Sequence, residues 1–82
     1  MYSILFSDTS FKQLKNLEKS VQKRLISALD RIKVRPEQFV RRLVNSPYFR
    51  LRAGDYRIIM DIKHQELIIL VLEIGHRKNI YK

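Results

Sequence analysis

Two hydrophobic patterns divide the chain. Residues 2–6, Tyr-Ser-Ile-Leu-Phe, combine aromatic and β-branched residues in a short run that predicts a strand. Apolar residues then recur at helical spacing, first at Phe11, Leu14 and Leu17. A second stripe follows, formed by Val21, Leu25, Ala28, Leu29 and Ile32. From Phe39 onward the spacing changes to alternation, so we expect one strand, two helices and then several strands.

Polar residues mark where the two helices should begin and end. Ser10 and Gln13 have the spacing of a capping box, which predicts that the first helix starts at Ser10. A second start at Ser20 precedes the longer apolar stripe. Because the residue before a proline avoids the helical region, Pro36 should end the second helix near Arg35.

The second half of the chain predicts a sheet. Strands are expected around residues 41–44, 49–53, 56–63 and 66–74. Short connections at 53–55 and 64–65 predict that the last three strands form an antiparallel meander. The segment Leu67–Leu72 is apolar at successive positions, which is typical of a central strand covered on both faces.

These elements predict an α+β fold in a single domain over residues 1–82. Two N-terminal helices should pack on one face of a mostly antiparallel sheet of four to five strands. The order of elements is β-α-α-β-β-β. The opposite face of the sheet is then free for function.

Composition narrows the class of protein. The 82 residues suit one small domain, and the 45% hydrophobic content is enough for one core. There is no cysteine and no Cys/His spacing, so neither disulfides nor a structural zinc is expected. No apolar run approaches the roughly 18 residues of a membrane span, and Met1–Ser7 is too short and uncharged for a secretory signal. We therefore expect a soluble cytoplasmic protein that does not bind membranes.

The charge balance indicates the type of partner. Seventeen Lys and Arg residues stand against eight Asp and Glu residues, a net charge of +9. Such an excess predicts an anionic partner, which is a nucleic acid, an acidic protein, or both. Charge alone does not choose among them.

Both glycines of the chain, Gly54 and Gly75, lie in segments that combine arginine with an aromatic residue. These segments are residues 50–59 and 74–81. Strand alternation places Arg50 and Arg52 together on one face, and it places Arg57 opposite its apolar neighbours. Several arginines on one face would suit a polyanion whose phosphate is held by guanidinium groups.

The remaining residue types favour one chemistry over others. The acids are scattered and the two histidines have no partner at ligand spacing, which disfavours metal-dependent hydrolysis. There is no glycine-rich phosphate loop and no recognisable Ser/His/Asp nucleophile site. Arginine, tyrosine and histidine suffice for metal-free RNA cleavage, in which the ribose 2′-hydroxyl attacks the adjacent phosphate. No small-molecule cofactor is expected.

Residues 48–59 and 75–81 carry a resemblance to a known family. Read as YFRLRAGDYRII and GHRKNIY, they resemble the RelE/ParE superfamily of bacterial and archaeal toxins, and the likeness extends over nearly the whole chain. It implies a RelE-like toxin of a toxin–antitoxin system. Such a messenger-RNA interferase enters the ribosomal A site, cleaves the codon there and so inhibits translation. A cognate RelB-like antitoxin would neutralise it, with the ribosome and messenger RNA as its other partners.

The resemblance also implies catalytic roles. Arg57 matches the arginine that contacts the scissile phosphate. Arg77 and Tyr81 match the arginine and terminal tyrosine implicated in phosphate activation and proton transfer. A phenol is a base near neutral pH only if nearby positive charge, here Arg77 and Lys78, lowers its pKa. His76 is the alternative group for proton transfer, because an imidazole titrates nearer to neutral pH.

Three residues are expected to bind RNA, namely Arg50, Arg52 and Lys78. Arg50 and Arg52 align with a basic pair that is lysine in several active members of the family. A guanidinium holds phosphate well but remains protonated, so it is a poor proton shuttle. Met60 stands where many relatives carry an aromatic residue for base stacking.

The residues alone are also compatible with roles that involve no RNA. The three strand arginines are also compatible with solvated cross-strand positions, and Tyr81 with a C-terminal anchor packed on the sheet edge. The resemblance itself includes a ParE branch that inhibits DNA gyrase without cutting RNA. It also includes inactive relatives that only bind RNA or an antitoxin.

Overall fold

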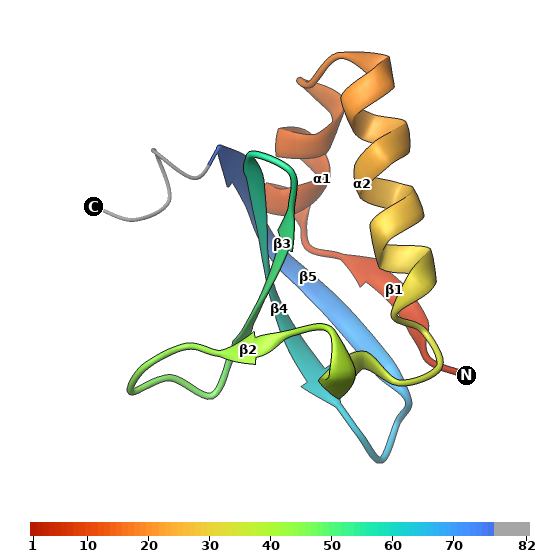
Figure 1. Ribbon diagram of the computed structural model, residues 1–82, viewed down its shortest axis with the longest axis vertical. Helices are drawn as coiled ribbons and strands as arrows, with labels where there is room; N and C mark the ends of the chain where they lie inside the picture. Colours follow the sequence, from red (N-terminus) through yellow and green to blue (C-terminus); the bar gives the residue numbers. More distant parts are fainter. Residues whose placement is uncertain (77–82) are drawn as a thin grey trace.

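The computed structural model describes residues 1–76 as two helices packed on a five-stranded sheet (Figure 1). The elements are β1 (Ser3–Phe6), α1 (Asp8–Lys15), α2 (Lys19–Arg31), a short 3-10 helix (Pro36–Gln38), β2 (Arg41–Arg42), β3 (Phe49–Ala53), β4 (Tyr56–Lys63) and β5 (Ile68–His76). The predicted α+β class is therefore confirmed. Four strands follow the two helices, as many as the predicted strand ranges and one more than in the order β-α-α-β-β-β.

The sheet is mixed, with strand order β1-β5-β4-β3-β2. Strands β3, β4 and β5 form the antiparallel meander that the short connections predict, and β2 extends it on one edge. The first strand, β1, runs parallel to the last, with Ser3 opposite Ile68 and Phe6 opposite Val71. Residues from the two ends of the sequence thus lie side by side, and β1 and β2 form the two edges.

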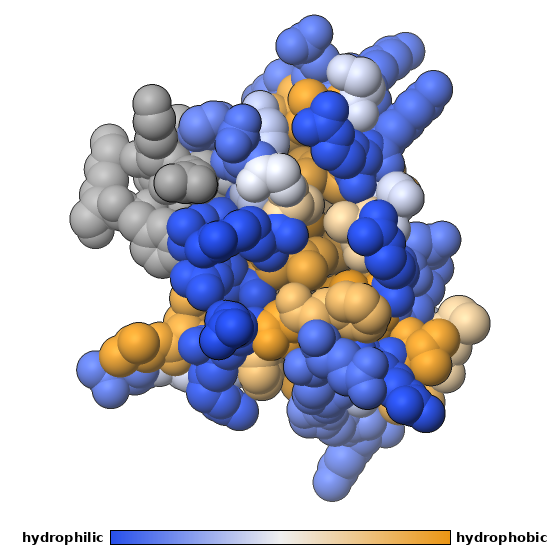
Figure 2. Space-filling model, in the orientation of Figure 1, coloured by the Kyte–Doolittle hydropathy of each residue, from blue (hydrophilic) through white to orange (hydrophobic). Residues whose placement is uncertain are grey.

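One hydrophobic core lies between the helices and the sheet. The helices contribute Leu14, Leu25 and Leu29, and the residue after α2, Ile32, joins them. The strands contribute Leu51, Ala53, Ile58, Met60, Ile62, Ile69, Val71 and Ile74, which alternate along each strand except where the register between β4 and β5 shifts, at residues 59 and 60. Alternation along β4 and β5 therefore defines a helix-covered face and an opposite face. Apolar residues also reach the surface near the centre of the view in Figure 2, flanked by hydrophilic side chains.

The start of α1 differs from the prediction. Ser7, rather than Ser10, caps the helix, because its Oγ accepts the Ser10 backbone N–H at 3.1 Å. Ser10 is buried inside the first turn and donates its hydroxyl to the Val71 carbonyl at 2.8 Å. Gln13 accepts the Ile74 N–H through its side-chain oxygen at 2.6 Å. The Ser10 and Gln13 side chains therefore attach α1 to β5 instead of forming a capping box.

The end of α2 also differs. The helix stops at Arg31, not near Arg35, since the N–H of Ile32 bonds to the carbonyl of Leu29 at 3.2 Å in a tighter turn. Ile32 then enters the core, and Pro36 begins the 3-10 helix. The start is one residue before the predicted Ser20.

Two strands have other bounds than expected. Strand β2 is two residues long because residues 43–48 form a loop, closed by the Leu43 N–H donating to the Tyr48 carbonyl at 2.9 Å. Strand β5 starts after Leu67, whose φ of 57° belongs to the turn. It is central in the sheet, and its buried residues are Ile69, Val71 and Ile74, whereas Leu70 and Leu72 are half-buried. Both helices lie on one face of β5, so the expected covering of its other face is incomplete.

Candidate nucleic-acid interface

Four arginines lie on the sheet face opposite the helices. Arg41 is the direct cross-strand partner of Arg50, and Arg52 is the partner of Arg57. Directly opposed residues of antiparallel strands share a face, and so do residues two apart on one strand. The pairing of β2, β3 and β4 therefore gathers all four guanidinium groups on one surface, called here the arginine face (residues 41, 50, 52 and 57).

Sequence reasoning anticipated three of these four arginines and missed Arg41. The expected strand over 41–44 contained two adjacent arginines, and alternation alone does not tell which one shares a face with β3. The register decides this, because Arg41 pairs with Arg50 whereas Arg42 pairs with Phe49. The Arg42 guanidinium lies over the Phe49 ring, 4.8 Å from its centroid. This cation–π contact favours the orientation of Arg42 toward the face opposite to that of Arg41 and Arg50.

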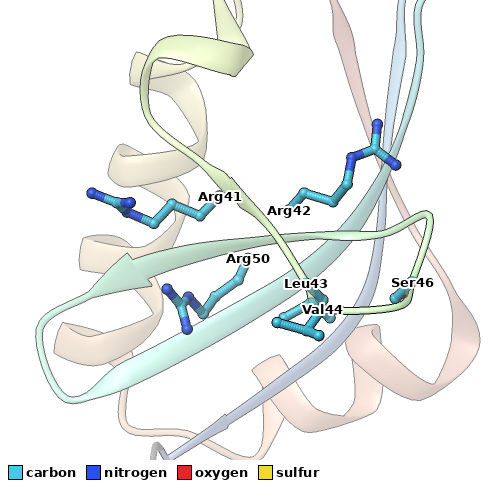
Figure 3. Close-up of a pocket in the computed structure, with 6 residues that line it drawn as sticks. All are labelled: Arg41, Arg42, Leu43, Val44, Ser46 and Arg50. Atoms are coloured by element: carbon cyan, nitrogen blue, oxygen red, sulfur yellow. The ribbon is translucent and has the colours of Figure 1, made fainter.

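Two hollows lie beside β2 and β3. The first, called here the arginine hollow, has a volume of about 450 Å³ and is lined by Phe39, Arg41, Arg50 and Arg52. The second, called here the loop hollow, has a volume of about 660 Å³ and is lined by Arg41, Arg42, Leu43, Val44, Ser46 and Arg50. Arg41 and Arg50 line both. Figure 3 shows these two side chains projecting to one side of the strands while Arg42 projects away.

The arginine face places like charges directly opposite each other. Like charges placed directly opposite on antiparallel strands destabilise a sheet, and two such pairs follow each other along β3. Ile59, the partner of Arg50 on β4, is only 7% exposed although it stands outside the core cluster. Arg57 is half-buried, with its Nε atom hidden from solvent. Guanidinium groups over such an apolar floor interact with an anion more strongly than groups in open water.

The structure separates His76 from the arginine face. His76 is the partner of Tyr56, and the two rings meet edge to face with centroids 5.5 Å apart. Tyr56 alternates with Arg57 along β4 and packs against the helix-side core. The ring of His76 therefore lies on the other side of the sheet from Arg57. The remaining predicted site residues, Arg77, Lys78 and Tyr81, lie outside the described residues.

Met60 belongs to the core and not to the site. Its side chain is 0% exposed on the helix-covered face, between its strand partners Phe49 and Val71. A base bound at the arginine face would not meet the side chain at position 60. The difference from aromatic-bearing relatives therefore leaves the arginine face unchanged.

Residues 1–76 contain neither a metal-binding cluster nor a membrane-spanning helix. In this part of the chain no three His, Asp or Glu side chains gather as they would around a metal ion. Neither helix there combines the length and the apolar content needed to cross a bilayer. Within these residues, the pairing of β2, β3 and β4 gathers the four arginines of the arginine face beside two hollows.

The described geometry defines a class: a small α+β domain with a helix-covered core and an opposite face that carries four arginines. Comparison of the amino-acid sequence with models of protein families identifies the family to which the chain belongs. A family model described as "ParE toxin of type II toxin-antitoxin system, parDE" matches residues 4–81. The chain therefore belongs to the ParE toxin family, within the RelE/ParE superfamily.

Solved structures give the same fold. The chain is 22% identical to a chain in the RelBE2 toxin–antitoxin complex of Mycobacterium tuberculosis, with a TM-score of 0.82, covering 93% of this chain and 98% of that one. The toxin–antitoxin complex RelBE of E. coli contains a chain 21% identical to this one, with a TM-score of 0.78, and the match covers 93% of this chain and 96% of that one. The archaeal RelE–RelB complex of Pyrococcus horikoshii contains a chain 26% identical to this one, with a TM-score of 0.78, and the match covers 95% of this chain and 97% of that one. A comparison with curated proteins returns no match.

These comparisons confirm the resemblance predicted from residues 48–59 and 75–81. The protein is a toxin of a toxin–antitoxin system with a RelE-like fold. The family model carries the name of the ParE branch, and the solved neighbours carry the name of the RelE branch. The two branches correspond to the two activities considered next.

Proposed function

We propose that this toxin is a ribosome-dependent messenger-RNA endonuclease whose arginine face holds the scissile region of the transcript. The observation that carries the proposal is the pairing of Arg41 with Arg50 and of Arg52 with Arg57 on one face. Two guanidinium groups that face each other across adjacent strands can hold one anion between them. A phosphodiester backbone supplies such anions at regular intervals.

The proposed reaction is metal-free transesterification. The ribose 2′-oxygen attacks the adjacent phosphorus as its proton passes to a base, and the bond from phosphorus to the 5′-oxygen breaks. The leaving 5′-oxygen takes up a proton, which leaves a 2′,3′-cyclic phosphate and a 5′-hydroxyl. Arg57 neutralises charge on the non-bridging oxygens, with Arg77 in the same role by family resemblance. Arg50 and Arg52 hold the neighbouring backbone, and Lys78 is assigned to RNA binding from the sequence.

Proton transfer is assigned to Tyr81 in preference to His76. The assignment of Tyr81 rests on its match to the terminal tyrosine of the family. The ring of His76 packs against Tyr56 on the helix-covered face, so it lies away from Arg57. This contact supports a packing role for His76.

Primer extension on translated messenger RNA tests the proposal. Arg57→Ala should lower the cleavage rate about 10²- to 10³-fold, the usual effect of removing one preorganised charge-stabilising group. Tyr81→Phe should also slow cleavage, whereas His76→Gln should cleave like the parent. Arg35→Gln, which removes an exposed arginine from the connection before Pro36, is the matched control. Parent-like cleavage by Arg57→Ala would overturn the proposed role of the arginine face.

A second candidate function is inhibition of DNA gyrase, and the family model named for ParE toxins favours it. This activity needs a protein-binding surface and does not need phosphodiester cleavage. Intact transcripts together with blocked DNA supercoiling by the purified protein would establish it in place of the first proposal. A protein that shows neither activity would instead be an RNA- or antitoxin-binding relative.

We also propose a RelB-like antitoxin as partner, and the cytoplasm as the place where toxin, antitoxin and ribosome meet. The solved neighbours from three organisms are named as complexes of toxin with antitoxin. The net charge of +9 suits an acidic partner. Co-expression of the toxin with its neighbouring open reading frame should give a co-purifying complex that relieves growth arrest. Toxin that purifies alone, without harming the host, would contradict this.

A further inference from the structure

The loop hollow differs from the arginine hollow in its lining. Its wall is mostly apolar, formed by Leu43, Val44 and the stems of the surrounding arginines, whereas the arginine hollow is mostly polar. Val44 is 89% exposed, so its side chain is open to a ligand. Arg41 and Arg50 form the boundary, since both hollows share them. A charged compartment thus adjoins an apolar one.

The loop that shapes this hollow is held by its own hydrogen bonds. The Leu43 N–H donates to the Tyr48 carbonyl at 2.9 Å, and the Tyr48 N–H donates to Ser46 Oγ at 3.1 Å. Asn45 has a φ of 57°, a left-handed conformation that asparagine tolerates better than most residues. The apolar wall is therefore organised before any ligand arrives, which lowers the entropy cost of binding.

Nucleic acid has the same pairing of a charged part with an apolar part. We propose that the loop hollow receives a nucleobase of the RNA whose phosphate lies between Arg41 and Arg50. A volume of about 660 Å³ falls within the range of ligand-sized pockets. Unpaired bases bind proteins by stacking on apolar, aromatic and guanidinium surfaces, and Leu43, Val44 and Arg41 supply such surfaces. Ser46 Oγ accepts a backbone N–H and still has its own proton to donate to a base.

The spacing along β3 supports a single RNA strand crossing both hollows. Arg50 and Arg52 are two residues apart, so the two arginine pairs are separated by about 7 Å along the strand. This separation is close to that of successive phosphates in an extended single strand. One phosphate at the Arg52 and Arg57 pair and the next at the Arg41 and Arg50 pair would bring a base to the loop hollow. The inference rests on the proposed function for the identity of the strand as RNA.

Direct binding tests the inference separately from cleavage. The probe is a labelled single-stranded RNA, compared by fluorescence anisotropy at low salt with an abasic strand of the same length and charge. The parent should bind the base-containing strand about tenfold more tightly, the usual contribution of one stacked base. Val44→Tyr should increase this preference because an aromatic ring stacks better, and Val44→Ser should reduce it. Arg52→Ser should weaken both strands by the same factor, since Arg52 lines only the arginine hollow and its loss removes a phosphate contact.

A matched control comes from the opposite edge of the sheet. Val34 is also an exposed valine and follows α2, next to Lys33, whose carbonyl accepts the Tyr2 N–H beside β1. Val34→Tyr should leave both affinities unchanged. Equal binding of the base-containing and abasic strands by the parent, or equal effects of Val34→Tyr and Val44→Tyr, would overturn the inference. The inference would also be overturned if an acidic peptide, added with no other change, abolished the preference for the base-containing strand. The hollow would then be assigned to a protein partner.

Failure of the base site and failure of the nuclease proposal give different experimental results. A protein that prefers base-containing RNA but leaves translated messages intact would retain the loop hollow as a base site and refute the nuclease proposal. A protein that cleaves messages but binds both strands equally would refute the base site alone.

Discussion

Replacing Arg52 with glutamine should make the free protein more stable while weakening its hold on RNA. Arg52 is exposed and stands directly opposite Arg57 on β4. The change removes one positive charge from the pair and keeps a long polar side chain on the strand. The arginine face would then be less costly to fold and less attractive to a phosphate.

The expected gain follows from the geometry of the pair. Directly opposed residues have Cβ atoms about 4.5–5.5 Å apart, and favourable pairs there contribute about 0.2–1 kcal/mol, so we take a like-charge pair to cost a similar amount. Long arginine side chains bend apart, so we expect about 0.5 kcal/mol for Arg52→Gln at low salt. With a urea dependence of about 1 kcal/mol per molar, this moves the unfolding midpoint up by about 0.5 M. In 1 M salt the Debye length shrinks to about 3 Å, and most of the gain should disappear.

Urea unfolding followed by far-UV circular dichroism is the suitable assay. Urea is uncharged, so the salt concentration can be set independently, and the chain has no tryptophan to serve as a fluorescence probe. Arg35→Gln is the charge-matched control, because it lowers the net charge by the same amount without touching the arginine face.

Three results would refute the reasoning. One is an unchanged or lower midpoint for Arg52→Gln at low salt. Another is a gain that persists in full at high salt, since the repulsion should be screened there. The third is an equal gain for Arg35→Gln, which would trace the effect to net charge and not to the cross-strand pair.

Three further stability predictions use thermal or chemical unfolding of single variants. Gly54→Ala should cost about 1–2 kcal/mol, since the turn holds residue 54 at a φ of 61°; an unchanged melting temperature would contradict this. Ser7→Ala should cost about 1 kcal/mol by removing the α1 cap, whereas Glu18→Ala should cost almost nothing because Glu18 makes no side-chain cap bond; equal losses would refute the assignment. Leu25→Ala should cost about 2–5 kcal/mol in the core, against less than about 0.5 kcal/mol for Ile26→Ala, which is 49% exposed; the reverse order would show that α2 faces the other way.

The elements that the sequence predicted well are those with a strong local pattern. The apolar stripe through Leu25 and Leu29 predicted α2, and alternation through residues 56–63 predicted β4. The predicted cap at Ser10 failed because Ser10 bonds to the main chain of β5, a partner 61 residues away. Local spacing carries no information about such a partner.

The candidate site was predictable in part for the same reason. Alternation over residues 50–57 grouped Arg50 and Arg52 and set Arg57 apart from its apolar neighbours, because a strand imposes that period on its own side chains. Arg41 and the loop hollow were missed, since they depend on how β2 pairs with β3 across a six-residue connection over residues 43–48. The roles predicted for Arg77, Lys78 and Tyr81 remain predictions from the sequence.

Local periodicity and composition were therefore enough to establish the types of element, the single core and the positive charge, because each of these depends on neighbouring residues or on a sum over the chain. Pairing between distant strands decided the rest. It placed β1 beside β5, joined Arg41 to Arg50, and turned His76 toward Tyr56 on the helix-covered face. Register between strands is set by packing of the whole domain, and a shift of one residue would send every one of these side chains to the other face.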